Sequence, residues 1–278
     1  MFAPQVSVGL EAFPFHVHWD ALGLVAALAI GYLSGIRVLG PRHASDPDSI
    51  VTRRQIMWFT AGLAVFLLVE TWPVHDIGEQ SLFTFHMVEH LALALLIPPF
   101  LLLGVPGWLM RLVVRPMMPV LRFMTRPIVA IAFFNVVLAL IHVPAVLEAM
   151  LSSEAVHFGL HLALLLSAAV MWWPVIGPIP DLPKLRPEMA MGYLFLQSLV
   201  PTIPASFLTF ANDVVYKAYE DLPRLWGFDV LADQLVAGLL MKIGGGIVLW
   251  TAIAVIFFRW AAAEERSGSA FTGMGVRS

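Results

Sequence analysis

Cysteine is absent from this chain of 278 residues, and charged side chains are scarce. Without cysteine the chain forms no disulfide and offers no thiolate, so a metal site would use histidine, methionine, carboxylate or amide groups. Charged residues make up 13% of the sequence, about half the share found in ordinary globular domains. So few charges cannot cover a water-facing surface of this size, so most of the exterior must contact lipid.

The charge balance also excludes a typical nucleic-acid-binding protein. Sixteen Lys and Arg stand against 19 Asp and Glu, which gives a net charge of -3. Nucleic-acid-binding domains carry a strongly basic patch, because neutralising phosphates supplies much of their affinity. We therefore expect no nucleic-acid partner.

Hydrophobic residues, in contrast, are abundant, at 59% of the chain. They gather in seven runs, each near the ~20 residues that a helix needs to cross the hydrocarbon core. The sequence therefore predicts an all-α, polytopic membrane protein with seven transmembrane helices, embedded in a lipid bilayer. The runs cover approximately residues 19–36, 56–72, 82–103, 128–147, 156–176, 189–211 and 230–258.

Basic residues fall mostly on one side of these predicted spans. The first, third and fifth connections and the segment after the last run contain Arg37, Arg42, Arg53, Arg54, Arg111, Arg115, Arg122, Arg126, Lys184, Arg186, Arg259, Arg266 and Arg277. Because short cytoplasmic loops carry the Lys and Arg residues, the sequence predicts the N-terminus outside and the C-terminus inside. Residues 1–260 then form a single transmembrane domain, and residues 261–278, which are small and polar, are predicted to be a disordered cytoplasmic tail.

Two histidine pairs with the same spacing open the third and fifth predicted spans. His86 and His90 begin and end the string HMVEH, and His157 and His161 begin and end HFGLH; Leu-Ala-Leu follows both. Histidines four residues apart share one face of a helix, so each pair can offer two imidazoles to one centre. A single pair is compatible with a hydrogen-bonded packing role, but two pairs at the same depth favour a metal.

An offset of 71 residues maps one histidine string onto the other and also carries Pro73 onto Pro144. This correspondence predicts a repeated helical hairpin, near 56–103 and 128–176. A parallel repeat would bring the two histidine pairs together near the outer surface. Chance similarity between apolar sequences is the alternative.

Other polar residues are predicted to lie in the same outer layer. The second choices for metal binding, or for orienting the ligands, are His142, Asp233, Gln234 and Met241. Lys242 falls inside the last predicted span, where an unpaired ammonium costs at least ~2.5 kcal/mol. We expect Glu89 or Glu70 to be its charge partner.

Three kinds of chemistry fit such a cluster. His86 to His90 spells HxxEH, the pattern of an inverted zinc peptidase in which Glu89 would activate water. Two imidazoles from separate spans can also ligate haem. Several histidines at one depth suit a bound or transferred metal better, and a thioether shifts the preference toward monovalent copper. The residues therefore favour copper, with zinc and haem as alternatives.

Several short strings occur in a fixed order along the chain: HMVEH at 86–90 with Pro98, Pro99, Gly104 and Pro106; His142 and Pro144; His157 and His161 with Trp172, Trp173 and Pro174; Gln197 with Leu208, Thr209 and Phe210; and Asp233, Gln234, Ala237, Gly238 and Met241. At these residues the sequence resembles the CtaG-type cytochrome c oxidase assembly factors of the caa-oxidase class. The resemblance implies a multi-pass protein of the bacterial plasma membrane, without enzymatic turnover, that assists assembly of a haem-copper oxidase as a copper metallochaperone, with the oxidase subunits as partners.

Overall fold

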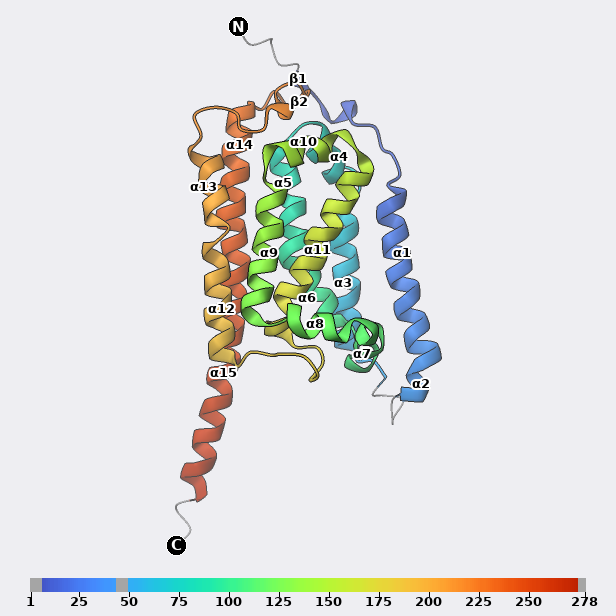
Figure 1. Cartoon of the computed structure of the whole chain (residues 1–278), viewed down its shortest axis with the longest axis vertical. Coiled ribbons are helices and arrows are strands. Elements are labelled where there is room, and N and C mark those ends of the chain that lie inside the picture. The colour runs from blue at the N-terminus through green and yellow to red at the C-terminus, as the bar shows by residue number, and fades with distance from the viewer. Residues whose placement is uncertain (1–6, 44–49, 275–278) are drawn as a thin grey trace.

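The computed structural model describes residues 7–43 and 50–274, and their side chains as far as Arg266. The described chain is almost wholly helical, which confirms the predicted all-α class. Its long helices stand side by side in one bundle (Figure 1): α1 (Trp19–Ser34), α3 (Arg53–Val69), α5 (Phe83–Leu91), α6 (Ile97–Gly104), α9 (Pro127–Ile141), α11 (Glu154–Ile176), α12 (Pro187–Leu199), α13 (Thr202–Phe210), α14 (Val230–Leu239) and α15 (Gly245–Met274).

The remaining elements connect these helices. They are the α-helices α2 (Gly40–His43), α4 (Val74–Gln80), α7 (Gly107–Val114), α8 (Met118–Met124) and α10 (Pro144–Ser152), the 3-10 turns η1 (Leu10–Ala12), η5 (Arg115–Met117) and η6 (Lys217–Tyr219), and the π-helical turns η2 (Gly35–Leu39), η4 (Ala92–Leu96) and η7 (Leu240–Gly244). Two strands of two residues each, β1 (Ser7–Val8) and β2 (Arg224–Leu225), pair in parallel.

Five helical stretches of the described chain are long and apolar enough to cross a membrane: Trp19–His43, Phe83–Gly104, Glu154–Ile176, Pro187–Phe210 and Val230–Arg266. Two further pairs of helices, α3 with α4 and α7–α8 with α9, meet the same criterion together but are bent by 40° and 94°. The structure thus contains five to seven candidate spans, and the predicted seven corresponds to one span for each bent pair.

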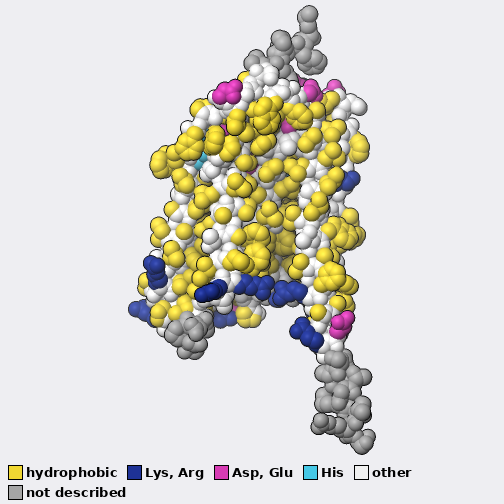
Figure 2. Space-filling model, turned by 180° about the vertical axis from the view of Figure 1, so that it is seen from behind, with side chains coloured by type: hydrophobic (Ala, Val, Ile, Leu, Met, Phe, Trp, Pro, Cys, Tyr) yellow, Lys and Arg dark blue, Asp and Glu magenta, His cyan; other side chains and the backbone are white. Residues whose placement is uncertain are grey.

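On the face shown in Figure 2, apolar side chains predominate between the two ends of the bundle. Ile128, Phe207 and Phe210 each expose more than 70% of their surface, which would be costly in water and is favourable in hydrocarbon. Lys and Arg side chains gather at one end, where α7 and α8 lie, and we call it the arginine end (Figures 1 and 2). The opposite end, which holds α4 and α10, is the histidine end.

The helix that carries the first histidine pair is irregular further along. The π-helical turn η4 separates α5 from α6, just before Pro98 and Pro99. Pro98 has no N–H for the carbonyl of Ala94, and this carbonyl instead accepts a hydrogen bond of 3.0 Å from Trp172 Nε1 on α11. The break is therefore compensated across the helix contact, and α5 is tied to α11.

Part of the helix pattern follows the offset of 71 residues. A long helix, a short helix and a helix that carries a histidine pair follow one another as α3, α4 and α5 and again as α9, α10 and α11. Adding 71 to the bounds of α4 gives 145–151, within α10, and adding 71 to the first residue of α5 gives 154, the first residue of α11. Two segments with the same plan thus place His86 and His157 at equivalent depths.

The C-terminal helix is longer than the sequence suggests. Helix α15 continues to Met274, so residues 261–274, which we expected to be disordered, are helical. Alanines with glutamates and an arginine at 261–266 have high helix propensity, which favours this continuation of the helix. Residues 275–278 of the predicted tail lie outside the described residues.

Candidate metal centre

The helix α5 is fixed at its start by a side chain from α14. The carboxylate of Asp233 accepts the backbone N–H groups of Phe83 (2.8 Å) and Thr84 (2.9 Å), which would otherwise have no partner at a helix start. Arg224 on β2 donates to the same carboxylate at 2.8 Å, and both side chains are buried. This buried ion pair sets where His86 and His90 lie along α5.

The short helix α4 packs directly against α5. Gly78 on α4 lies so close that a Cβ atom there would be 2.9 Å from the backbone nitrogen of His86. Tyr219, from the segment between α13 and α14, donates to the carbonyl of Gly78 at 2.7 Å, and Tyr216 donates to the carbonyl of His142 at 2.9 Å. Burial raises the pKa of both tyrosines, so they remain neutral donors.

Four buried side chains from α5 and α11 converge beneath this cover. His86, Glu89, His157 and His161 expose 0%, 0%, 3% and 4% of their surface. One ligand atom from each lies within 4.8 Å of every other. We call these four residues the buried centre. Three imidazoles and one carboxylate form a donor set that suits a transition metal.

The histidines of the buried centre are oriented by carboxylates outside it. His161 Nδ1 lies 3.0 Å from Glu70 Oε2, and His157 Nδ1 contacts Glu79 Oε1. Where these carboxylates are ionised they accept the Nδ1 protons, which leaves the Nε2 atoms of both histidines free to bind a metal. Carboxylate, histidine and metal commonly follow one another in this order in metal sites.

The two Nε2 atoms that keep lone pairs face each other. His157 Nε2 and His161 Nε2 are 3.0 Å apart. Two nitrogens bound tetrahedrally to one metal at its usual bond length lie about 3.3 Å apart. The spacing of this pair is therefore close to what a shared cation requires, and a cation would remove the repulsion between the lone pairs.

The first histidine pair supplies further unused nitrogens. Both ring nitrogens of His86 and of His90 are buried without a hydrogen-bond partner among the described residues. A buried polar group left unpaired costs about 1–3 kcal/mol. Such a cost at several neighbouring atoms is typical of a site that is completed by a ligand.

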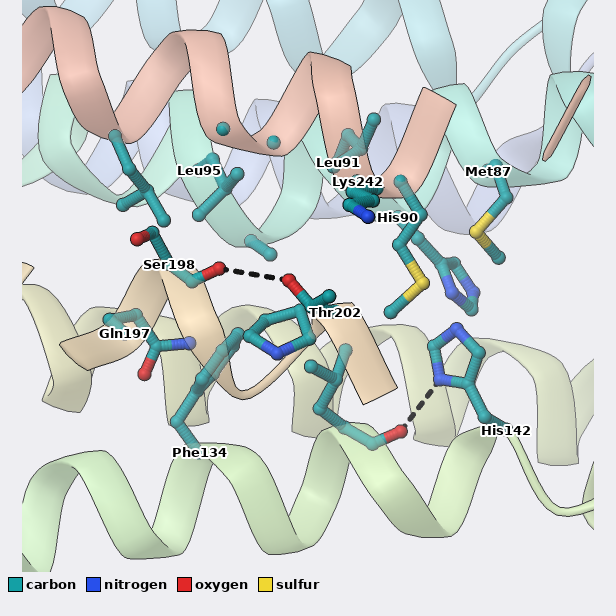
Figure 3. Close-up of a pocket in the computed structure, with 17 residues that line it drawn as sticks. Met87, His90, Leu91, Leu95, Phe134, His142, Gln197, Ser198, Thr202 and Lys242 are labelled. Atoms are coloured by element: carbon teal, nitrogen blue, oxygen red, sulfur yellow. Dashed lines mark hydrogen bonds between the residues drawn. The ribbon is translucent and has the colours of Figure 1, made fainter. Parts of the chain in front are cut away.

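His90 faces away from Glu89, toward a neighbouring pocket. Its ring lies 5.1 Å from His161 and 5.9 Å from His142 between centroids. The pocket contains about 530 Å³ of empty space, part of it open, and Met87, His90, His142, Met241 and Lys242 are among its lining residues. Figure 3 shows the thioether of Met87 and the rings of His90 and His142 around one space. Soft and borderline donors thus lie next to the buried centre.

Three of the residues predicted from the sequence lie elsewhere. Asp233 binds the start of α5 and Arg224, and Gln234 accepts from Val215 N at 2.7 Å and donates to backbone carbonyls. The polar atoms of Asp233 and Gln234 therefore hold the start of α5 and the segment between α13 and α14. Lys242 is exposed on η7, and no ion pair joins it to Glu89 or Glu70 within the described residues; those carboxylates lie against histidines instead.

The sequence analysis missed Glu79 and Met87 and did not connect His75 with the centre. His75 Nδ1 lies 3.3 Å from Glu89 Oε1, and His75 Nε2 lies 3.5 Å from Glu79 Oε2. His75 and Glu79 are four residues apart, so on a helix they share one face, and this spacing could have indicated the site. The sequence analysis did not predict a helix there, because α4 is short and follows the end of a hydrophobic run.

The fold and the site together define a class: an all-helical protein with five to seven candidate membrane spans and buried histidines and carboxylates near one end. The family model for the cytochrome c oxidase caa3 assembly factor matches residues 30–263. The chain belongs to this family.

Curated relatives are distant and longer than this chain. The chain is 25% identical to the uncharacterized proteins Mb0105 of Mycobacterium bovis and MT0111 of Mycobacterium tuberculosis, over 96% of its own length and 42% of theirs. An uncharacterized protein of Mycobacterium leprae, ML1998, is 22% identical over 91% of this chain and 41% of its own. The chain thus spans about two fifths of the relatives it matches. No solved structure matches it.

Proposed function

We propose that this protein binds copper in the buried centre and carries it, without enzymatic turnover, to a haem-copper oxidase during assembly. The family gives the setting of oxidase assembly. The observation that carries the copper proposal is the arrangement of His157 and His161, whose Nε2 lone pairs face each other at 3.0 Å beside the unpartnered nitrogens of His86. A metal cation bound between these atoms would satisfy them together.

The choice of copper depends on the neighbouring pocket. Imidazoles and a carboxylate alone suit zinc, iron or copper. The thioethers of Met87 and Met241 border the same pocket as His90 and His142, and thioethers select monovalent copper among these ions.

A zinc peptidase that uses HxxEH at 86–90 is less well supported. That mechanism needs His86 and His90 on one zinc, with Glu89 beside them free to activate water. Glu89 Oε1 instead lies 3.3 Å from His75 Nδ1, and the group of converging ligand atoms contains Glu89 but not His90. Glu89 therefore acts in this proposal as a ligand or as an orienting group.

The proposed setting is the bacterial plasma membrane, crossed by seven spans, with the histidine end outside. Copper would then be received on the outer side, and the partners would be oxidase subunits. The positive-inside distribution of the arginines supports this orientation.

The experiment removes imidazoles from both histidine pairs. The full chain, purified in detergent without metal, is titrated with Cu⁺ held by bicinchoninate, and the loss of colour reports copper transfer. We expect stoichiometric transfer to the native chain and its loss in the His86→Ala/His157→Ala variant. His43→Ala is the matched control, because His43 is an exposed histidine at the other end of α1 and α2.

Three results would overturn this proposal. Unchanged transfer to the double variant would mean that the copper site lies elsewhere. A Soret band in the protein purified from its membrane would mean haem, and zinc that resists competition by copper would favour the peptidase. Loss of oxidase activity in cells that carry the double variant in place of the native chain would test the assembly role itself.

A further inference from the structure

A second group of metal-binding side chains lies at the histidine end, outside the buried centre. His16 Nδ1 lies 2.8 Å from Asp76 Oδ1, and His18 Nε2 lies 3.0 Å from Asp76 Oδ2. The three residues offer ligand atoms that lie within 4.8 Å of one another. His16 and His18 belong to the segment before α1, and Asp76 belongs to α4.

This group bridges the surface and the interior. The side chain of His16 is 54% exposed, that of His18 is 9% exposed, and that of Asp76 is 1% exposed. An ion from solution can therefore reach His16 directly. The buried carboxylate of Asp76 supplies the negative charge that holds a cation at this position.

His75 connects this group with the buried centre. Its ring lies 4.7 Å from the ring of His18 on one side and 5.0 Å from the ring of His157 on the other, between centroids. The rings of His16 and His18 are 4.1 Å apart, as are those of His157 and His161. The imidazoles thus form a row from the exposed His16 to the buried centre, and the ring centroids of neighbouring histidines are at most 5.0 Å apart.

A buried centre requires such a route. His86 and Glu89 expose none of their surface, and His157 and His161 almost none. A free ion cannot cross an apolar wall, because the cost of removing its hydration shell is too high. Movement between neighbouring imidazoles keeps the ion coordinated throughout, since each new metal–nitrogen bond replaces one that breaks.

We propose that His16, His18 and Asp76 form an uptake site for a transition-metal cation, which His75 then passes to the buried centre. The transfer is a ligand exchange, so the ion keeps its oxidation state. His16 and His18 precede residues 30–263, which the family model matches, whereas Asp76 and His75 lie within them. The inference rests on the proposed function, because it requires the buried centre to bind metal.

The test separates the rate of loading from the amount loaded. The full chain, metal-free and in detergent, is mixed rapidly with the coloured Cu⁺–bicinchoninate complex, and the loss of colour is followed in time. In the His16→Gln/His18→Gln variant, glutamine keeps an N–H donor for Asp76 but binds copper poorly. We expect the total loss of colour, which reports the copper bound in the buried centre, to equal that of the native chain. We expect the loading rate to fall about 10-fold or more.

Asp76→Asn provides a second variant, and it should slow loading in the same way because the carboxylate charge is lost. His43→Ala is again the control, and its loading rate should equal that of the native chain. A native loading rate in both the glutamine variant and the Asp76→Asn variant would overturn the uptake site and leave only a structural ion pair. If the glutamine variant lost less colour in total than the native chain, the uptake site would also be overturned, because these histidines would then be needed for binding copper in the buried centre itself.

These results are distinct from a failure of the proposed function. If the native chain takes up no copper, the buried centre is wrong and the uptake site falls with it. If the native chain loads copper and the glutamine variant loads equally fast, only the uptake site is wrong.

Discussion

At the scale of single residues, the buried ion pair between Asp233 and Arg224 positions the first histidine pair. Asp233 satisfies the first two N–H groups of α5, and Arg224 also donates to the carbonyls of Ser81 and Phe228. One carboxylate therefore joins α14, β2 and α5 directly below the surface of the histidine end. Removing its charge leaves a buried guanidinium without compensation.

We expect Asp233→Asn to lower the free energy of unfolding by about 3–5 kcal/mol, the usual cost of breaking a buried pair. Thermal unfolding of the purified chain in detergent, followed by circular dichroism, would measure the change. Asp181→Asn is the matched control: Asp181 pairs with Arg111 at 2.7 Å, but the two side chains are 39% and 49% exposed. Loss of such a surface pair should cost about 1 kcal/mol or less. Equal effects would show that the Asp233 pair is not buried.

The residues that could be predicted from the sequence are those with a local pattern. His157 and His161 are recognisable because a spacing of four fixes a shared helix face, and the repeated string points to His86. The partners that orient them, Glu70 and Glu79, come from other helices, and no local spacing indicates such contacts. The contact by which Asp233 fixes the start of α5 could not be read from the sequence for the same reason: its partner Phe83 is 150 residues away in the chain.

At the scale of elements, the hydrophobic runs of the sequence did not indicate the short helices α4 and α10. The predicted run 128–147 continues past the end of α9 at Ile141 and into α10, which begins at Pro144. Hydrophobicity does not change at this point, so only the proline indicates that the chain turns. The corresponding turn in the first segment places α4 against α5, with Gly78 at the closest approach.

Gly78→Ala should therefore distort the site while leaving most of the bundle intact. The added methyl group would lie 2.9 Å from the backbone nitrogen of His86 and 3.3 Å from Glu89 Oε1, so α4 must move away from α5. We expect copper affinity to fall about 10-fold or more, as when groups that orient metal ligands are lost. Competition with bicinchoninate would measure this affinity.

Gly159→Ala is the natural control for that variant. Gly159 lies on α11 between His157 and His161, and a Cβ atom there would meet no atom within 4 Å. Its copper affinity should equal that of the native chain, and its helix should be slightly more stable, because alanine loses less backbone entropy than glycine. If Gly78→Ala also kept native affinity, the contact between α4 and α5 would not position the centre.

At the scale of the whole molecule, charge and apolar surface divide the bundle into two ends and a middle. Composition alone predicts the class, because 13% charged residues leave no alternative to an apolar exterior. The order of helices around the bundle is beyond the reach of the sequence, because many pairings of apolar helices bury similar areas in lipid. The arginine end and the histidine end nevertheless follow from the connections, and their separation in the structure agrees with that division (Figures 1 and 2).

The absence of cysteine allows the orientation to be tested with single introduced thiols. Glu148 on α10 is exposed at the histidine end, and Arg122 on α8 is exposed at the arginine end. If the arginines face the cytoplasm, a membrane-impermeant maleimide added to intact cells should label the Glu148→Cys chain and not the Arg122→Cys chain. Both chains should be labelled once the membrane is opened, which controls for access to each thiol. The reverse pattern in intact cells would place the histidine end inside, and copper would then have to reach His16 from the cytoplasm.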